Sequence, residues 1–398
     1  MIKYSIIFLV SALLVAVGGC DHSNANYCAG KLNDDCRSDG GTQVTGCVAT
    51  PSKCTGMTSV CDTDKDVCVP CNEPNTQAAS CPAAAPVCSS QTCGVCTADA
   101  QCDSGVCRAD GTCSLENTVV YVSLQSIVTG CTSDLPCDLH TGLSKIEEQR
   151  NVLHLAPGTY AAPAGPAGIS IVVPTVIVGR GATVSRGAAG PTIATSVDLT
   201  VEFLTVTGGL SATGTGIEVT AGTFAMTRSL VFGNKGGGVS ISGGSFKITN
   251  SVIVENGDAG SPGSTFGGVR LTSTASDNVF EQNTVAFNHS QIGNPGLACT
   301  TLPVFRARRN IVTSNNMVMT FPVMQAVGCN DTESYLSAGT AANDLNFASL
   351  VSPPNLHLTE NSPATVRDIP ELTTCQGVDI DGEARPKNGF CDLGADEF

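Results

Sequence analysis

Cysteine is the residue type in this sequence most able to do chemistry, because a thiolate can bind a metal ion, form a disulfide or carry a lipid. The 398-residue chain contains 21 cysteines. Fourteen of them lie between Cys28 and Cys113, among Asp, Ser, Thr, Pro and Ala and with few large apolar side chains. A segment so poor in core residues needs covalent cross-links to hold one conformation.

Two Cys-x2-Cys pairs in this segment, Cys68–Cys71 and Cys93–Cys96, could supply four thiolates to a zinc ion. The many neighbouring cysteines and the export signals described below favour disulfides instead. Outside the segment we predict three further bridges: Cys131–Cys137, Cys299–Cys329 and Cys375–Cys391.

Charged side chains could support cleavage of uronate polymers, which needs a strong base and cations or calcium to neutralise the carboxylate. The acids are scattered, however, and no run of aspartates recurs in neighbouring repeats. We therefore favour solvated exterior charges over a catalytic set and predict no cofactor, with calcium as the ion to test. The candidates are Arg270, Arg306, Arg308 and Arg309 as bases, and Asp258, Asp277 and Glu281 as calcium ligands.

Other catalytic patterns have little support in this sequence. Glycoside hydrolysis needs two or three carboxylates close together, and no Asp-Asp pair occurs between Gly168 and Asn315. The sequence has no phosphate-binding loop, no H-E-x-x-H and no dinucleotide fingerprint.

The N-terminus has the features of an export signal. Lys3 precedes an apolar run, Ile6–Val17, which is too short for a membrane span and typical of a signal peptide. The run ends in Val17-Gly18-Gly19-Cys20, which resembles a bacterial lipobox. We predict a lipoprotein signal peptide over 1–19, a lipidated linker over 20–27 and a lipid anchor on Cys20. An ordinary signal peptidase site is the alternative.

This signal predicts a location in the cell envelope, at the outer membrane or cell surface rather than the inner membrane. The inner membrane is the alternative location, because Asp21 follows Cys20 and aspartate after the lipidated cysteine retains some lipoproteins there. The formal net charge of -15 disfavours nucleic acid and anionic lipid as partners. Few aromatics, 43 glycines and no tryptophan suit sheets with tight turns.

An internal repeat gives the main evidence for the fold. A glycine followed by an alternating strand recurs clearly at Gly168, Gly216, Gly238 and Gly268, and more weakly at Gly190 and Gly296. An asparagine follows four of these starts by 18 to 20 residues: Asn234, Asn256, Asn288 and Asn315. Two marks at a near-constant offset describe one coil of a solenoid. We expect the asparagines to form a stacked amide ladder at one corner, where they can adopt left-handed backbone angles.

The sequence therefore predicts an all-β chain, in which residues 28–114 form a disulfide-rich module and residues 115–398 a right-handed parallel β-helix. We expect a strand at 119–123 and then a helix over 139–150. The next strand, which ends in Pro157-Gly158-Thr159-Tyr160, resembles the entry to bacterial parallel β-helices, and this resemblance implies that the helix covers the first coil. Cys299 takes the third place after Gly296, which alternates onto the core face, and Cys329 follows about one long coil later. This register predicts their bridge, with two buried free thiols as the alternative.

The C-terminal sequence resembles the closing segment of bacterial right-handed β-helix surface proteins of the choice-of-anchor Q type, which share a pectate-lyase-like fold. The matching pattern, D-x-D-G-x-x-R-P followed by D-x-G-A-x-E, begins at Asp379 and ends at Glu397. The resemblance covers roughly residues 119–398. We interpret four of its residues as a capping turn held by ion pairs and hydrogen bonds: Asp379, Asp381, Arg385 and Asp392. That group often continues into a C-terminal anchor, whereas here the N-terminal lipid would anchor the protein.

Together these features predict a monomeric, non-enzymatic surface lipoprotein, with a rigid β-helix rod that binds a glycan or a protein and a Cys-rich stalk beneath it. The alternative is a polysaccharide lyase or glycoside hydrolase. A cluster of acids and bases on one face of three adjacent coils would favour the enzyme.

Overall fold

The computed structural model describes Val48 and residues 60–72, 75–124, 126–260, 263–299, 306–317, 326–327, 329, 331–337, 345–369, 375, 377–387 and 389–398. The chain divides into two compact units, Met1–Val69 and Pro70–Phe398, so the boundary lies inside the Cys-rich segment. The predicted signal peptide and Cys20 lie outside the described residues. In the first unit, β1 (Val60–Asp62) and β2 (Val67–Val69) form an antiparallel pair.

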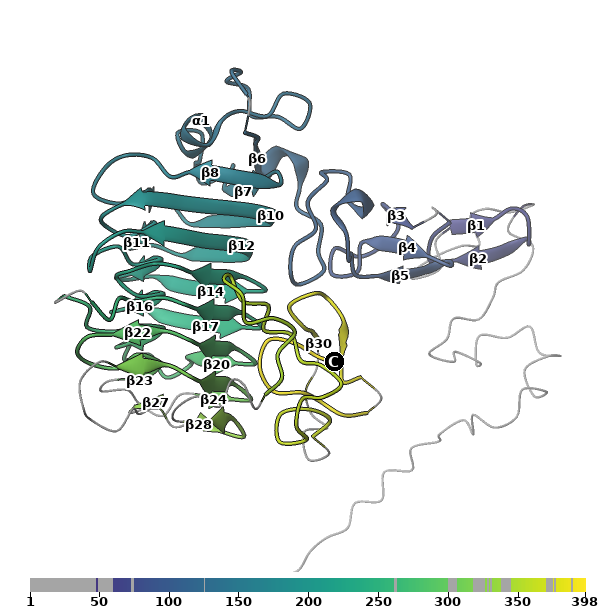
Figure 1. The fold of residues 1–398 in the computed structure, drawn as a ribbon. Helices are drawn as coiled ribbons and strands as arrows, with labels where there is room; N and C mark the ends of the chain where they lie inside the picture. Colours follow the sequence, from purple (N-terminus) through teal and green to yellow (C-terminus); the bar gives the residue numbers. More distant parts are fainter. Residues whose placement is uncertain are drawn as a thin grey trace, which may run out of the picture. The chain divides into compact units, whose positions relative to one another are not determined.

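The second unit is a parallel β-helix, which confirms the predicted fold class (Figure 1). Face 1 of this β-helix is a sheet in which each strand pairs in register with the strand of the next coil. In β9, β13 and β19 the middle side chain points outward and the two flanking side chains are buried. The described strands of face 1 are β9 (Ile169–Ile171), β11 (Ile193–Thr195), β13 (Ile217–Val219), β16 (Val239–Ile241), β19 (Val269–Leu271), β23 (Leu297–Cys299) and β27 (Ala326–Val327).

The other two faces belong to one sheet, because β10 (Thr175–Ala188) and β12 (Leu199–Gly209) run around the corner between them. Phe203 in β12 has a positive φ, and strands of different faces pair on either side of it. Face 2 contains β6 (Val119–Val122), β7 (Val152–Leu155), β14 (Thr223–Thr227), β17 (Ser245–Thr249), β20 (Val279–Glu281), β24 (Arg306–Arg308) and β28 (Asp331–Thr332). Face 3 contains β8 (Gly158–Ala161), β15 (Leu230–Phe232), β18 (Val252–Val254), β21 (Thr284–Ala286), β25 (Ile311–Thr313) and β29 (Tyr335–Leu336).

Short elements complete the described structure. β3 (Thr76–Gln77), β4 (Val87–Ser89) and β5 (Thr92–Gly94) form an antiparallel sheet, as do β30 (Gly377–Val378) and β31 (Ala384–Arg385). β22 (His289–Ser290) pairs with β26 (Asn316–Met317) in parallel. The 3₁₀ helices are η3 (Asp99–Gln101) and η4 (Glu116–Thr118).

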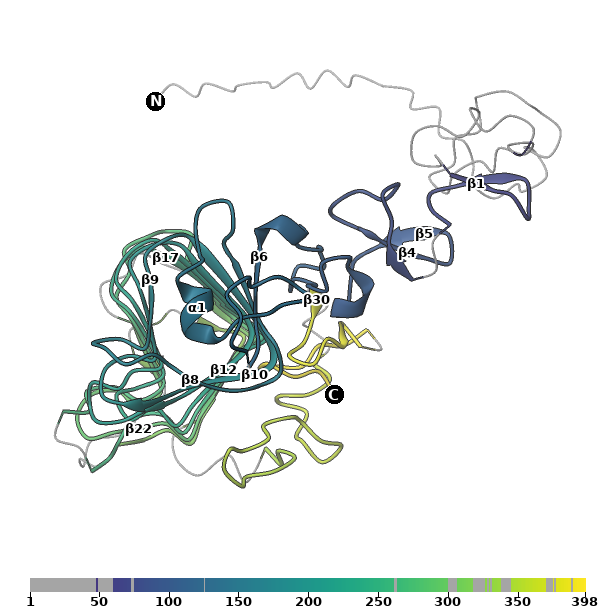
Figure 2. The same ribbon diagram turned by 90° about the horizontal axis from the view of Figure 1, so that it is seen from above.

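The predicted helix over 139–150 is much shorter than expected. α1 spans only Leu139–Leu143, and Asp138 caps its start by accepting the Thr141 N–H. Glu147 and Arg150 then form a backbone bridge that is incompatible with helix. Figure 2 shows α1 over the end of the coil stack, as expected for a cover of the first coil. In the described part of the chain, no helix has both the length and the apolar character for a membrane crossing.

A ladder of buried asparagines forms the corner between faces 3 and 1. The side-chain amide of Asn234 donates to Oδ1 of Asn256 (3.0 Å), that of Asn256 to Asn288 (3.1 Å), and that of Asn288 to Asn315 (2.8 Å). The asparagines themselves do not have left-handed backbone angles, contrary to our expectation. The residue before each has the positive φ, because the chain turns there and the side chain then points inward: Gly233, Glu255, Phe287 and Ser314.

A second ladder, at the corner between faces 2 and 3, was not predicted. Its side chains accept the backbone N–H of the residue one coil earlier, and serine and asparagine share the role. Its members are Ser229, Ser251, Asn283, Asn310 and Ser334.

The weak repeat expected at Gly190 is out of register. β11 starts at Ile193, so Thr192 occupies the place that glycine holds in the clear repeats. At Gly238 a Cβ would approach the carbonyl oxygen of Gly268 to 2.5 Å, which explains glycine there. Thr192 is fully buried and its hydroxyl bonds the Thr207 carbonyl (3.3 Å), so this coil lacks the glycine mark.

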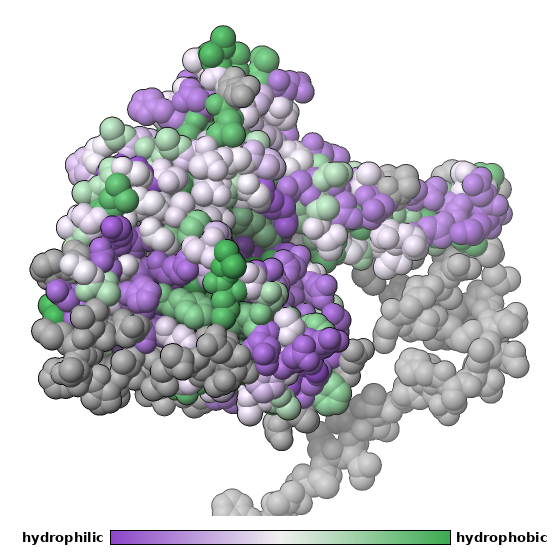
Figure 3. Space-filling view, viewed as in Figure 1, coloured by the Kyte–Doolittle hydropathy of each residue, from purple (hydrophilic) through white to green (hydrophobic). Residues whose placement is uncertain are grey.

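The C-terminal residues do not cap the end of the solenoid as expected. Figures 1 and 2 show them beside the coils, and their apolar side chains pack on the outer side chains of face 3. Val252, Val254 and Ile311 on face 3 are covered in this way by a cluster that includes Leu356 and Leu393. Hydrophilic side chains gather on the outside of this segment (Figure 3). The segment thus converts an apolar face into a polar surface.

Candidate functional site

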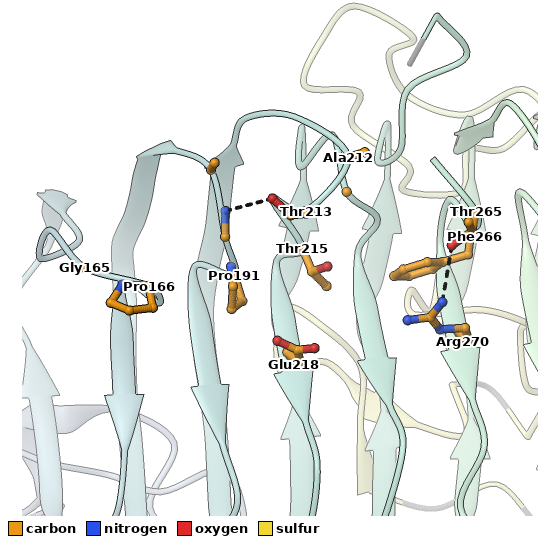
Figure 4. A pocket seen from close by; sticks show the side chains of 13 residues that line it. Gly165, Pro166, Pro191, Ala212, Thr213, Thr215, Glu218, Thr265, Phe266 and Arg270 are labelled. Carbon is orange, nitrogen blue, oxygen red and sulfur yellow. Dashed lines mark hydrogen bonds between the residues drawn. The ribbon is translucent and has the colours of Figure 1, made fainter. Parts of the chain in front are cut away.

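A groove runs along the edge of face 1, where the turns after the asparagine ladder lead into the strands. Its volume is about 660 Å³. The lining comes from five successive coils, so at about 4.8 Å per coil it extends ~19 Å. Figure 4 shows these residues along the edge of successive strands. They are Gly165, Pro166, Ala189, Gly190, Pro191, Ala212, Thr213, Thr215, Glu218, Gly236, Thr265, Phe266 and Arg270.

Arg270 is the cation of the groove, and its position is fixed by several contacts. It is the outward residue of β19, and its guanidinium donates to the hydroxyls of Ser240 (3.0 and 3.3 Å) and Thr265 (3.3 Å). The same group lies 4.5 Å from the ring centroid of Phe266 (Figure 4). The ring itself is only 3% exposed, so it supports the arginine from below and offers little surface to a ligand.

An acid, a hydroxyl and a base occupy equivalent positions on three adjacent strands. Glu218 in β13 pairs with Ser240 in β16, and Ser240 pairs with Arg270 in β19. Partial burial lowers the pKa of Arg270, and the negative charge of Glu218 opposes this. Threonines add hydroxyl groups at the same edge, where Thr213 accepts the Gly190 N–H (3.4 Å). The groove can therefore hydrogen-bond several hydroxyls of a ligand and one anionic group.

Among the predicted charged residues whose side chains the structure describes, only Arg270 lines this groove. Arg308 pairs with Glu281 on face 2 (2.6 Å), and Arg309 is buried and pairs with Glu333 (3.1 Å). The other two predicted acids, Asp258 and Asp277, lie apart from both of these ion pairs. Asp258 is near Lys235 (3.7 Å), and Asp277 is exposed.

For Arg306 the structure describes the backbone, in β24, and not the side chain. Glu218 and Ser240 were missed. Aligning the glycine-led repeats would have shown them, because both occupy the outward position of the strand as Arg270 does.

The cysteines described in the second unit are disulfide-bonded. Within the Cys-rich segment the bridges are Cys71–Cys88, Cys81–Cys93, Cys96–Cys107 and Cys102–Cys113. Cys71, Cys93 and Cys96 each have a sulfur partner outside their Cys-x2-Cys pair, so their thiolates are not available to zinc. In the β-helix the bridges are Cys131–Cys137, Cys299–Cys329 and Cys375–Cys391.

The C-terminal motif forms a buried polar network. Oδ1 of Asp379 accepts the backbone N–H groups of Asp381 (3.0 Å), Gly382 (2.7 Å) and Glu383 (2.7 Å). Arg385 has a fully buried side chain, which donates to the Asp392 and Gly394 carbonyls and pairs with Glu397 (3.4 Å).

Asp392 and Asp396 are two further acids in this part of the chain. The Asp392 carboxylate accepts the N–H groups of Asp368 and Phe398. Burial raises the pKa of nearby Asp396 to about 6. The motif residues hold the segment together, whereas Asp381 is exposed and faces His357.

Comparison with known proteins identifies no family for this chain. No family model matches it, and no curated protein matches it. Among solved structures, a pectate lyase (Pel9A) is similar over 70% of this chain and 96% of its own, at 14% identity and a TM-score of 0.32. The assignment of the fold rests on the parallel strand pairing described above.

Proposed function

We propose that the protein is a surface lipoprotein whose face 1 groove binds an extended glycan that carries an anionic substituent. The observation that carries this proposal is that Glu218 and Arg270 both line the groove from equivalent strand positions, with the buried Ser240 between them accepting from Arg270. Arg270 would hold a carboxylate or sulfate group, while Glu218 and the threonines would bond neutral sugar hydroxyls. The C-terminal likeness to choice-of-anchor Q proteins agrees with a role at the cell surface.

The hydrogen bonds of Arg270 and the single carboxylate of Glu218 favour ligand binding over cleavage in this groove. The guanidinium of Arg270 makes three hydrogen bonds to hydroxyl acceptors, and all of them need its protons. An arginine held in this way is a fixed cation rather than a general base. Glu218 is the one carboxylate among the lining residues, whereas hydrolysis needs a pair.

The test is a glycan array that contains uronate and sulfated oligosaccharides, read with the wild-type protein and with Arg270→Gln. We expect Arg270→Gln to weaken binding of the anionic ligand about 10-fold or more, because a charge-assisted hydrogen bond contributes about 1.5–3 kcal/mol. Lys247→Gln removes one exposed positive charge from face 2 and is the matched control. Equal binding by all three proteins would place the ligand elsewhere, and release of unsaturated or reducing sugars would show catalysis.

The proposed lipid anchor has its own test. Cys20→Ser removes the sulfur that would take diacylglycerol, so the variant should leave the membrane fraction or remain unprocessed. Fractionation of cells with an antibody against the β-helix measures this. A variant that matures normally and still sediments with membranes contradicts the anchor.

A further inference from the structure

Three side chains from separate stretches of the C-terminal segment converge on one point. Nε2 of His357 lies 2.6 Å from Oδ2 of Asp381 and 4.0 Å from Oδ1 of Asp396. These ligand atoms all lie within 4.8 Å of one another. The cluster sits on the segment that covers face 3, and it shares no residue with the groove on face 1.

The geometry of His357 is that of a ligand with a free lone pair. Oδ1 of Asn355 accepts the backbone N–H of His357 (3.1 Å), which identifies this atom as the amide oxygen. The ring atom Nδ1 faces the same oxygen and therefore carries the proton. In the neutral ring Nε2 then carries the lone pair, and it is directed at the two carboxylates. A metal-bound histidine is oriented in the same way, by donating its other ring N–H to an oxygen.

The three facing ligand atoms would be satisfied by a cation, either a proton on Nε2 or a metal ion. Nε2 is shielded from solvent and has no hydrogen-bond partner, because its short contact with Asp381 lacks hydrogen-bond geometry. A neutral imidazole would turn its lone pair towards two carboxylates. An imidazolium would direct its N–H at the carboxylates of Asp381 and Asp396, so a proton and a metal ion would compete for Nε2. A divalent cation between the three atoms satisfies the lone pair and both carboxylates.

The surroundings hold two of the ligands in place and leave the third accessible. Asp396 has a side chain only 9% exposed, and its Oδ2 accepts the Leu358 N–H (2.7 Å), so Oδ1 is directed towards His357. Asp381 is 56% exposed and follows Asp379, whose carboxylate accepts its N–H. An ion can therefore enter from solvent past Asp381.

We propose that His357, Asp381 and Asp396 bind one zinc ion, which ties three stretches of the C-terminal segment together. One imidazole nitrogen with two carboxylates favours a transition-metal ion over calcium, which takes six to eight oxygen ligands. Three protein ligands leave a fourth position for water.

The test uses the full chain with its disulfides intact, dialysed first against a chelator and then against chelator-free buffer at neutral pH. Zinc chloride is titrated by calorimetry, and cobalt chloride is followed by its visible absorption. We expect one ion per chain, and at least about a 10-fold loss of affinity in both His357→Gln and Asp381→Asn. Millimolar calcium should not displace the zinc.

Matched controls are His140→Gln and Asp277→Asn, which change an exposed histidine and an exposed aspartate elsewhere and should bind zinc normally. Circular dichroism of each variant establishes that it is folded. The proposal is overturned if the wild-type protein binds neither zinc nor cobalt, if both variants bind as tightly as the wild type, or if calcium competes equally. These outcomes do not depend on whether the groove on face 1 binds a glycan.

Discussion

At the corner between faces 3 and 1, asparagine side chains hydrogen-bond backbone groups that the sheets leave without partners. Where the chain turns between faces 3 and 1, N–H and carbonyl groups are buried but point out of the sheets. The buried side chain of Asn256 accepts the Asn234 N–H (3.2 Å) and donates to the carbonyls of Val231 (2.8 Å) and Val254 (3.0 Å). Its side-chain amide also bonds the neighbouring ladder residues, Asn234 and Asn288. One residue type therefore satisfies the corner within its own coil and between coils.

We predict that Asn256→Ala destabilises the protein by about 2–4 kcal/mol, because each buried group left without a partner costs about 1–3 kcal/mol. The free energy of unfolding, measured by urea denaturation, checks this. Asn361→Ala changes an exposed asparagine and should alter stability by less than about 0.5 kcal/mol. If the two variants unfold at the same urea concentration, the ladder contributes no stability.

At the level of the strands, the core positions of face 1 bring Cys299 and Cys329 together. Cys299 aligns with Leu271 in the preceding strand and is buried in the main core. The two Cα atoms are 5.0 Å apart across 30 residues of sequence. The bridge thus joins successive coils at the end of the stack, where the next coil has fewer neighbours to hold it.

We predict that the double variant Cys299→Ala/Cys329→Ala loses about 3–4 kcal/mol of stability, the loop-closure value for 30 residues in the chain-entropy model. The loss should be local at first, since the last coils can unfold while the earlier coils stay paired. Hydrogen exchange measured by mass spectrometry can show this. Faster exchange in β24 and β25 with unchanged exchange in β13 and β14 is the expected result. Uniformly faster exchange would mean that the whole β-helix unfolds as one unit.

The start of a strand was predictable where the preceding position requires glycine. Gly168, Gly216, Gly238 and Gly268 precede face 1 strands because a Cβ would meet the next coil, so spacing alone located four coils. Thr192 takes the place of this glycine, and its hydroxyl donates to the Thr207 carbonyl. The start of that strand therefore could not be located from a glycine. The second ladder was missed for a related reason, because Ser251 and Asn283 perform one task with different side chains.

The groove and the C-terminal segment depend on contacts that sequence spacing does not reveal. The outward position of Arg270 was predictable from strand alternation. Its support by Phe266 and Thr265 depends on how the preceding turn folds. Leu356 and Val252 belong to one apolar cluster although they lie about a hundred positions apart, and both look like ordinary core residues in the sequence.

In the second unit as a whole, the last part of the Cys-rich segment is attached to the β-helix and does not form a separate stalk there. Arg180 in β10 bonds Asp99 (3.3 Å) and the Cys107 carbonyl (3.2 Å), and the Tyr121 hydroxyl bonds the Ser104 carbonyl (2.7 Å). These contacts connect residues 99–107 of the segment to the first coils. Its disulfides therefore stabilise a segment that also covers part of face 2.

The strongest link in this attachment is Glu202, which is buried in β12. Both of its carboxylate oxygens accept hydrogen bonds from Arg108 (2.9 and 2.8 Å), and one also accepts the Ala109 N–H (3.0 Å). Glu202→Ala leaves the guanidinium and this N–H without partners. We predict a loss of about 3 kcal/mol, at the low end of the effect of breaking a buried pair, because the Arg108 side chain remains 20% exposed.

Trypsin can measure the attachment directly, because Arg108 is itself a cleavage site. In the wild-type protein the bound Arg108 should resist cleavage, whereas Glu202→Ala should be cut there at least several-fold faster. The disulfide Cys102–Cys113 spans the cleavage site, so the cut appears on a gel only after reduction. Glu148→Ala, at an exposed glutamate, is the control. If all three proteins are cleaved at Arg108 equally fast, the segment is a mobile stalk in solution and the contacts with β12 do not hold it.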